Sequence, residues 1–430
     1  MTCSYRAFDE YAEIDNNVRT QVTESLSKLW FRTGPFKLSI CLLFFSVLMI
    51  LVPRSLHITK IISFSPVRSL SYTTMNFNNY DAMKYRQWVA LDRDEPPAND
   101  SSKLSIMTYN LLSRHYIWKN VYDKVDKLHL DWERHRFPLI NKTIEQFSCD
   151  IMCFQEMEYY IYKTFWGEQF PSYKYKSFYI QKQCPSNLNF FKNEKLDGVG
   201  IFVNTERFDV MEQLKINYGE EVLKQRSKYK LTSDWLQRVI ARNTVALILK
   251  LYDKRTDKIY YVSNTHLYWS PDYNDVKVLQ IKILLNKLQQ FRKEHDSSII
   301  LLGDLNSNFD SDVVNLLSGR TIDTLSSPTF KHRKYGVNNP LIDPDGRINN
   351  PFNLRNVYQS LHSSNNLPFT SYVTRFADVL DHVFVSDDVS VDKLLGQVDP
   401  VYCNSDDVTG FPNSQFPSDH IPLVVEVSHK

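Results

Sequence analysis

The sequence predicts an α/β fold in which two β-sheets pack against each other and helices lie on the outside. From Lys103 onward, short segments rich in Val, Ile, Leu and Tyr alternate with polar segments of helical character. This alternation continues without an internal repeat, as expected for one layered domain. Hydrophobic residues make up 43% of the chain and aromatic residues 13%, which excludes disordered and collagen-like proteins.

The expected strands are short apolar segments bounded by polar or turn-forming residues. They span 104–112, 149–157, 199–204, 244–252, 259–269, 297–306, 380–386 and 421–427. Two segments, 133–147 and 275–294, carry apolar residues at helical spacing, and Asp275 is the expected N-cap of the second. The polar segment 307–370 is expected to form surface loops.

The charge and glycine content exclude several classes of protein. The 51 Lys and Arg residues nearly balance the 49 Asp and Glu residues, so the net charge is +2. This balance excludes a protein that coats nucleic acid with dense positive charge, although it allows a local basic channel. With only 11 glycines, a glycine-rich nucleotide-binding fold is also disfavoured.

The six cysteines are scattered and form no CxxC pair. Cys149 and Cys153 lie beside or within an apolar run, where a free cysteine behaves as a small buried hydrophobic residue. We therefore expect no disulfide partner and no zinc site, and a reducing compartment fits better than secretion.

The N-terminal part divides into a polar extension over 1–37, a hydrophobic segment over 38–53 and a basic Ser/Thr-rich segment with a linker over 54–102. At 1.5 Å per residue the run from Leu38 to Val52 reaches about 22 Å, short of the ~30 Å hydrocarbon core of a bilayer. A single-pass membrane anchor and a signal-peptide core are two interpretations. The second is weaker, because Pro53 opens no small-residue cleavage site.

The third interpretation is import into mitochondria. Arg54, Lys60 and Arg68 lie among Ser and Thr residues with no acidic residue nearby, as in mitochondrial targeting segments. The acidic residues within 1–24 do not fit this pattern, and a start at Met49 would remove them. The expected location is mitochondrial, with possible membrane anchoring, and another intracellular membrane is the alternative.

Polar residues end or follow several expected strands, which is where site residues are found on layered folds. They are Asn110, Glu156, His266, Asp304, Asn306, Asp381, Asp419 and His420. Each has an ordinary explanation when taken alone, such as a turn residue, a helix cap or a hydrogen-bonded structural histidine. Their joint occurrence at strand ends is not explained in this way, and it predicts a site at one edge of the sheets.

Four longer strings carry a resemblance to a known family. They are DIMCFQEME at 150–158, NTHLYWSPDYNDVKVLQ at 264–280, GDLNSNFDSDVVNLL at 303–317 and FPSDHIPL at 416–423. In this order they resemble the endonuclease/exonuclease/phosphatase superfamily, in its deadenylase, nocturnin and Angel branch, and most of all the fungal Ngl-type RNA exonucleases. The resemblance implies a four-layered α/β sandwich, with two central mixed sheets flanked by helices, over 103–430.

The resemblance also implies a Mg²⁺-dependent phosphodiesterase, with Mn²⁺ as a substitute, that hydrolyses RNA from 3′ to 5′ with a metal-activated water. Mg²⁺ prefers oxygen ligands and keeps several waters, so one or two carboxylates hold it. Glu156 is the expected metal ligand, and Asn110 and Asp419 are expected to support the same ion directly or through water.

The remaining site residues are assigned to the nucleophile and the phosphate. Asp304 is expected to orient or deprotonate the water, and Asn306, two residues on, to share its sheet face and bind the nucleophile or a phosphate oxygen. His266 and His420 are expected to donate to phosphate oxygens. Asp381 is expected to orient His420 and favour its protonated form.

Two further residues are assigned to the substrate base by the resemblance. In deadenylases a proline and a phenylalanine hold a terminal base between them, and Pro271 and Phe376 match these positions. Ala377 and Asp378 stand where deadenylases usually carry Lys-Gly, which brings an acid near the expected substrate. A preference for poly(A) is therefore one expectation and a general RNA 3′ exonuclease is another.

Two alternatives to an exonuclease stay open. Angel relatives suggest RNA 2′,3′-cyclic phosphate hydrolysis and nocturnin suggests removal of a dinucleotide phosphate, and the motifs do not separate these reactions on the same site. A second class of function is a non-catalytic, membrane-anchored RNA-binding adaptor. The acidic and imidazole positions are all present, which argues against the adaptor.

Overall fold

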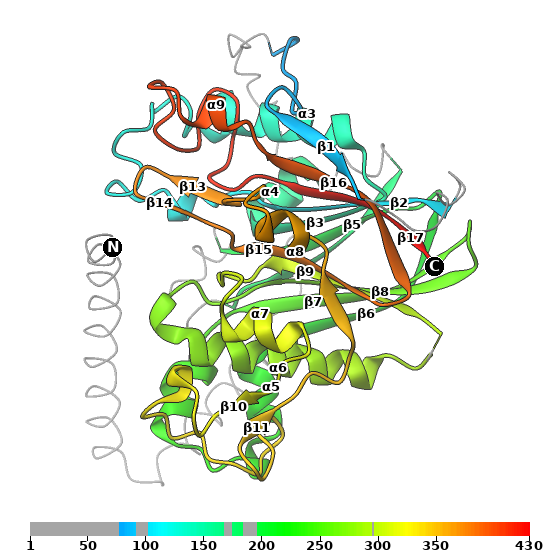
Figure 1. Cartoon of the computed structure of the whole chain (residues 1–430), viewed down its shortest axis with the longest axis vertical. Coiled ribbons are helices and arrows are strands. Elements are labelled where there is room, and N and C mark those ends of the chain that lie inside the picture. The colour runs from blue at the N-terminus through cyan, green and yellow to red at the C-terminus, as the bar shows by residue number, and fades with distance from the viewer. Residues whose placement is uncertain (1–76, 92–101, 167–173, 184–195, 295) are drawn as a thin grey trace, which may run out of the picture. The chain divides into compact units, whose positions relative to one another are not determined.

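The protein is described by a computed structural model that covers residues 77–91, 102–166, 174–183, 196–294 and 296–430. Two central β-sheets lie face to face with helices on their outer sides (Figure 1). This arrangement confirms the predicted four-layered α/β sandwich. The hydrophobic segment 38–53, the polar extension 1–37 and the alternative start at Met49 lie outside the described residues.

Both sheets are mixed, because each contains one parallel pair of strands. In order across the first sheet, the strands are β1 (Arg86–Ala90), β16 (Val389–Val398), β17 (Leu423–His429), β2 (Leu104–Asn110), β3 (Ile151–Glu158), β5 (Asp197–Asn204) and β4 (Tyr175–Gln181). Across the second they are β12 (Leu354–Asn356), β15 (Asp381–Ser386), β9 (Ser298–Asp304), β8 (Lys258–His266), β7 (Val245–Asp253) and β6 (Phe208–Asn217). The parallel pairs are β2 with β3 and β8 with β9.

The outer layers explain why the strand sequences are apolar on both faces. On β3, Ile151 and Cys153 belong to the core between the sheets, whereas Met152 and Phe154 pack in a second core with α3 (Phe137–Phe147). The second sheet is covered by helices that include α5 (Tyr218–Lys224), α6 (Asn274–Phe291) and α7 (Asp312–Leu317) (Figure 1). A strand buried on both faces has a nearly continuous apolar sequence, as β9 shows.

All eight expected strands are confirmed, but β1, β4, β6, β12 and β16 of the two central sheets were not predicted. The segment 307–370 was expected to form surface loops, yet it also contains α7 and β12. Strand β1 lies within 54–102, where a basic segment and a linker were expected, and it pairs with β16. Arg86 holds β1 against the sheet, because its buried guanidinium donates to the carbonyl oxygens of Leu395, Gly396 and Pro422. The folded domain therefore begins before residue 103.

The predicted cap of the second helix is wrong. Helix α6 begins at Asn274, and Asp275 lies within its first turn. The Asp275 carboxylate is buried, where it accepts hydrogen bonds from Arg238 Nε at 2.9 Å and Nη2 at 2.7 Å and from the Tyr335 hydroxyl at 2.6 Å. A buried carboxylate needs such partners more than an exposed helix end needs a cap.

Arg207 connects the two sheets through buried ion pairs. Its guanidinium is fully buried. It donates to Oδ2 of Asp150, directly before β3, at 2.9 Å and to Oδ2 of Asp253, at the end of β7, at 2.8 Å.

Removing one partner of a buried ion pair leaves an uncompensated charge. We therefore expect Arg207→Met to lower the free energy of unfolding by about 3–5 kcal/mol, measured by urea denaturation. The matched exposed variant Arg255→Met should change it by less than about 0.5 kcal/mol, and equal effects of the two variants would contradict this role.

No helix of the described residues is long and apolar enough to span a membrane. Of the described cysteines, Cys149 and Cys153 are buried in the core, as predicted.

Candidate active site

Five strand ends meet at one edge of the sandwich. Asn110 and Gln155 are paired on the parallel strands β2 and β3, and His266 and Asp304 are paired on β8 and β9. Strand β15 runs antiparallel to β9, so that its first residue, Asp381, lies opposite Asp304. Because carboxyl ends of parallel strands share an edge, these side chains from distant segments come together there.

Asn110 lies between two carboxylates that belong to different sheets. Its Nδ2 donates to Glu156 Oε1 at 3.0 Å and to Asp304 Oδ2 at 2.8 Å. Its Oδ1 accepts from the backbone N–H of Leu112 at 3.0 Å, which fixes the orientation of the amide. The buried amide group therefore fixes the position of Glu156, the predicted metal ligand, relative to Asp304, the predicted general base.

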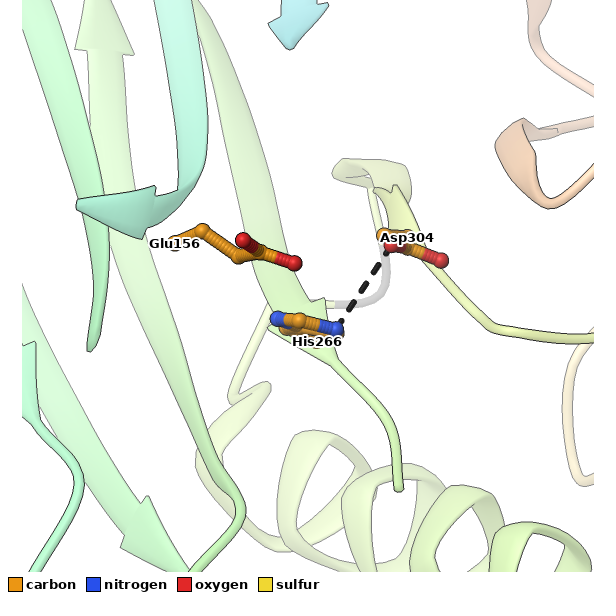
Figure 2. Close-up of side chains that lie close together, drawn as sticks. All are labelled: Glu156, His266 and Asp304. Atoms are coloured by element: carbon orange, nitrogen blue, oxygen red, sulfur yellow. Dashed lines mark ion pairs between the residues drawn. The ribbon is translucent and has the colours of Figure 1, made fainter. Parts of the chain in front are cut away.

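Glu156 takes its position from a break in the ladder between β3 and β5. The register shifts between Phe154 and Met157, and Glu156 has a φ of 55°, in the left-handed region. Its carboxylate points toward His266 and Asp304 (Figure 2). Burial, together with the negative charges of Asp419 and Asp197, raises the pKa of Glu156 to about 8.

Asp304 lies at the end of β9, where the backbones of β8 and β9 approach closely. A Cβ on Gly303, which has a φ of +136°, would lie 2.0 Å from Thr265 O, so only glycine fits beside Asp304. Burial and the charge of Asp381 raise the pKa of Asp304 to about 6. This carboxylate is therefore a stronger proton acceptor than an ordinary aspartate.

His420 and Asp381 form a buried hydrogen-bonded pair. His420 Nδ1 donates to Asp381 Oδ2 at 2.7 Å, and Thr370 Oγ1 donates to the same oxygen at 2.6 Å. Burial alone would lower the pKa of His420, but the charges of Asp381 and Asp419 outweigh it, so this pKa lies well above its usual value. His420 therefore carries a positive charge, with its Nε2 at 3.8 Å from Asp304 Oδ2.

His266 differs from His420 in its charge. Its Nε2 lies 3.5 Å from Asp304 Oδ2, the contact drawn as a dashed line in Figure 2. Burial, together with the positive charges of Lys182 and His420, holds the pKa of His266 well below its usual value. The site therefore contains one cationic and one neutral imidazole, both close to Asp304.

The predicted placement of Asn306 on the sheet face of Asp304 is wrong. Strand β9 ends at Asp304, and Asn306 has a φ of 47°, so the alternation of side chains along a strand does not reach it. Instead its backbone N–H donates to Asp304 Oδ1 at 2.8 Å, and its Nδ2 donates to Leu267 O at 3.1 Å. Asn306 therefore contacts the site through its backbone, and its side chain joins two loops.

Asp419 faces the site from the loop before β17. Its Oδ2 accepts from the Tyr122 hydroxyl at 2.9 Å, and its charge contributes to the raised pKa of Glu156. Tyr122 belongs to the segment that follows β2, and the backbone N–H of Ser113 in the same segment donates to Glu156 Oε2 at 2.8 Å. One segment therefore contacts both carboxylates that were assigned to the metal.

The described residues include groups able to hold a metal ion. Ligand atoms of Glu156, His266 and Asp304 lie within 4.8 Å of one another, and so do those of Asp304, Asp381 and His420. The second group is less suitable, because Asp381 and His420 are already hydrogen-bonded to each other. Glu156 and its neighbouring carboxylates offer oxygen ligands whose mutual repulsion a divalent cation would relieve, so the donor set fits Mg²⁺.

Pro271 and Phe376 lie on two segments that lead away from site residues, since Pro271 follows His266 along the chain and the ribbon of β13 (Ser371–Val373) and β14 (Phe376–Asp378) is bridged to His420 through Ser371. Pro271 begins a 3₁₀ turn, Pro271–Tyr273, in the loop that follows His266. Phe376 begins β14, which pairs with β13, and its side chain is 37% exposed. A core residue would not leave so much ring surface in water, so this exposure agrees with a ligand-contacting position. The base clamp itself stays a prediction.

Sequence reasoning missed a buried group next to Glu156. Lys182 Nζ lies 2.6 Å from Asp197 Oδ2, and the Tyr116 hydroxyl donates to Asp197 Oδ1 at 2.9 Å. Burial alone would lower the pKa of Lys182, but Asp197 and Tyr116 outweigh it, so this pKa is raised and the amine stays charged. Lys182 follows an unpredicted strand, β4, so no local pattern indicated it.

Sequence reasoning also missed a polar link between the sheets. Gln155 Nε2 donates to Asn264 Oδ1 at 2.8 Å, and Asn264 Nδ2 donates to Phe154 O at 3.0 Å. A signal was present, because Asn264 lies two residues before His266 and therefore shares its face of β8.

A sequence model of the Endonuclease/Exonuclease/phosphatase family matches residues 107–420. A CCR4-Not complex 3′-5′-exoribonuclease subunit Ccr4 from Candida albicans is 31% identical over 370 residues, covering 81% of this chain and 45% of the relative. The subunit of the same name from Kluyveromyces lactis is 28% identical and covers 86% and 49%. The chain thus spans about half the length of the curated relatives it matches.

Two solved structures share the fold. A crystal structure of ANGEL2, described as a 2′,3′-cyclic phosphatase, has a TM-score of 0.64 at 21% identity and covers 80% of this chain and 98% of its own. The human Nocturnin catalytic domain has a TM-score of 0.52 at 19% identity and covers 80% and 98%. These structures confirm the fold, and the family match and the Ccr4 relatives confirm the resemblance to this superfamily and its deadenylase, nocturnin and Angel branch.

The predicted location is wrong. The relatives are named as subunits of the CCR4-Not complex, which contradicts the expected mitochondrial location and its alternative at another intracellular membrane. The prediction depended on Arg54, Lys60 and Arg68 among Ser and Thr residues, and a basic segment rich in Ser and Thr does not by itself specify one compartment.

Proposed function

Because the chain belongs to the Endonuclease/Exonuclease/phosphatase family, we propose that it is a Mg²⁺-dependent 3′-to-5′ exoribonuclease. The observation that carries this proposal is that the Asn110 amide joins Glu156 to Asp304, while His420 Nε2 lies 3.8 Å from Asp304 Oδ2. The similar Ccr4 proteins are named as 3′-5′-exoribonucleases, which supports RNA as the substrate and the 3′ end as the starting point.

Glu156 would hold Mg²⁺, with Asp419 and Asn110 as supporting groups. When bound, the ion would offset negative charge on the phosphate oxygens. The chain prepares this place by holding Glu156 with two donors, the Asn110 amide and the Ser113 backbone N–H, and Asp419 with the Tyr122 hydroxyl. Each carboxylate keeps further acceptor capacity, since an ionised carboxylate accepts about four hydrogen bonds.

The opposite side of the site would act on the water and the phosphate. Asp304, with a pKa of about 6, accepts the proton of the attacking water while Asn110 Nδ2 and Asn306 N–H hold its two oxygens. Cationic His420, oriented by Asp381, donates to a phosphate oxygen, and neutral His266 donates a second hydrogen bond. These donors stabilise charge that develops on the phosphoryl oxygens.

Pro271 and Phe376 would hold the terminal base. We expect Phe376→Ala to weaken turnover of a short RNA by about 5–150-fold, because base stacking on an aromatic ring contributes about 1–3 kcal/mol. Turnover of the same RNA with an abasic 3′-terminal nucleotide, which has no ring to stack, should stay unchanged and is the control. Equal losses on both substrates would mean that Phe376 supports the fold and does not contact a base.

The preference for adenosine at the 3′ end is a separate question, because Asp378 follows Phe376 closely. Its carboxylate is engaged locally, since Oδ1 accepts from the Val379 backbone N–H at 2.8 Å. Because this contact leaves acceptor capacity on the carboxylate, an acid remains beside the expected base. This favours a general RNA 3′ exonuclease over one restricted to poly(A).

The test is hydrolysis by the full chain of 5′-labelled RNAs that differ only at the 3′ end. The set has an adenosine tail, a mixed sequence, a 2′,3′-cyclic phosphate and a 3′-phosphate block, and NADP is assayed beside it. An exonuclease shortens the first two RNAs stepwise in Mg²⁺ and not in EDTA. Removal of the cyclic phosphate alone, dephosphorylation of NADP alone, or binding of RNA without any cleavage would each overturn the proposal.

A further inference from the structure

Two indole rings meet on the loops that leave the candidate active site. Trp118 and Trp269 are both half-buried, with ring centroids 6.1 Å apart and an interplanar angle of 65°. Trp118 belongs to the segment after Asn110, and Trp269 belongs to the loop between His266 and Pro271. Neither ring has a part in the proposed chemistry.

The segment that carries Trp118 is attached to the metal side of the site. Its Ser113 N–H contacts Glu156 at 2.8 Å, and its Tyr122 hydroxyl contacts Asp419 at 2.9 Å. Between them, the Tyr116 hydroxyl donates to Asp197, and the Tyr116 ring lies 6.0 Å from that of Trp118. The segment that carries Trp118 is therefore held against the two carboxylates assigned to Mg²⁺.

The loop that carries Trp269 is attached to the other side of the site. The backbone N–H of Leu267 donates to Asp304 O at 3.0 Å, and Leu267 O accepts from Asn306 Nδ2 at 3.1 Å. Ser270, the residue after Trp269, is buried. Trp269 is therefore fixed between His266, assigned to the phosphate, and Pro271, assigned to the terminal base.

A third segment, which carries the exposed Phe376 ring, contacts the segment of Trp118. Arg375 Nη1 donates to Asn120 O at 3.2 Å, and Arg375 Nη2 lies 3.3 Å from Asp123 Oδ2. These contacts join the β13–β14 ribbon to the segment of Trp118. The tryptophan pair and the predicted Pro271–Phe376 clamp thus lie on loops that meet one another around a single site.

We propose that Trp118 and Trp269 form a second base-stacking subsite, which takes the base on the 5′ side of the scissile phosphate in single-stranded RNA. This inference rests on the proposed function. A phosphate between Glu156 and His266 has one nucleotide on each side, and the Pro271–Phe376 clamp would accept only the terminal one. Flat aromatic rings suit the other, because every base has a π-face and stacking on aromatic rings tolerates any sequence.

The test is a double-mutant cycle on binding, with Asp304→Asn as the parent so that the RNA stays intact. Fluorescence anisotropy gives Kd for two short RNAs that are identical except for an abasic penultimate nucleotide. In the parent, loss of this base should weaken binding by about 5–150-fold. With Trp118→Ala and Trp269→Ala added, the intact RNA should bind as weakly as the abasic RNA, and the abasic change should have no further effect.

Trp88→Ala is the matched control, because Trp88 is a half-buried tryptophan on β1 that packs against Phe147. This variant should keep the full effect of the abasic nucleotide. If the alanine variants do not fold, Trp118→Leu and Trp269→Leu keep apolar volume without an aromatic face and go through the same cycle. Equal Kd values of the parent for both RNAs, or additive losses, would overturn the subsite. Failure of the wild-type chain to shorten RNA would overturn the proposed function instead, and the binding cycle would still give its own answer.

Discussion

Asp304→Asn is expected to lower the rate of RNA hydrolysis by at least about 10²–10⁴-fold, the range that a positioned general base contributes. Asparagine has the shape of aspartate but accepts no proton from water. Asp304 Oδ2 accepts a hydrogen bond from Asn110 Nδ2 at 2.8 Å. After the change, an amide NH₂ can take the place of this oxygen, and it cannot accept that hydrogen bond. The position of the water would then be disturbed as well, which adds to the loss.

Binding of RNA by this variant should be retained, because the predicted base and phosphate contacts come from other residues. Single-turnover rates on a 5′-labelled RNA and anisotropy on the same RNA separate the two effects. Asp209→Asn, the same change at an exposed position on β6, is the matched control and should hydrolyse RNA at the wild-type rate. A wild-type rate in Asp304→Asn would remove Asp304 from the proton transfer.

The position of the site at a sheet edge could be predicted because its residues end apolar strands. His266 and Asp304 each end a strand that is buried on both faces. The end of such a strand is visible in the sequence, because the apolar run stops there. The unpredicted strands lack this signal. On β6, at the edge of its sheet, exposed and half-buried residues alternate from Asp209 to Lys215, and each set mixes apolar with polar or charged residues.

The geometry within the site depends on features that no local pattern shows. Glu156 and Asn306 both take positive φ values, which re-aim the chain where a strand pattern predicts plain alternation. The contact between Tyr122 and Asp419 joins residues 297 positions apart, and the pair of Lys182 and Asp197 joins two neighbouring strands. Such contacts follow from the packing of the whole sandwich, so composition and spacing did not predict them.

Glu156→Gln is expected to remove the response of the protein to Mg²⁺. Binding of an ion to the folded state raises its stability by about 2.7 kcal/mol when the free ion reaches 100 times its Kd. The wild-type protein should therefore show a higher Tm in Mg²⁺ than in EDTA. Glutamine removes the charge that would hold the ion, so this difference should disappear.

The loss of activity in Glu156→Gln should be about 10²–10³-fold, since the ion supplies several kcal/mol and each 1.36 kcal/mol is tenfold in rate. In EDTA the variant should be as stable as the wild type or more so, because burial beside Asp419 and Asp197 disfavours the charge of Glu156. Glu426→Gln, on β17 and paired with Lys393, is the matched control and should keep both the Mg²⁺-dependent Tm and the activity. If Glu156→Gln kept the wild-type shift of Tm in Mg²⁺, another group would have to hold the ion, and Asp304 would be the first to test because its carboxylate lies within the same cluster of ligand atoms.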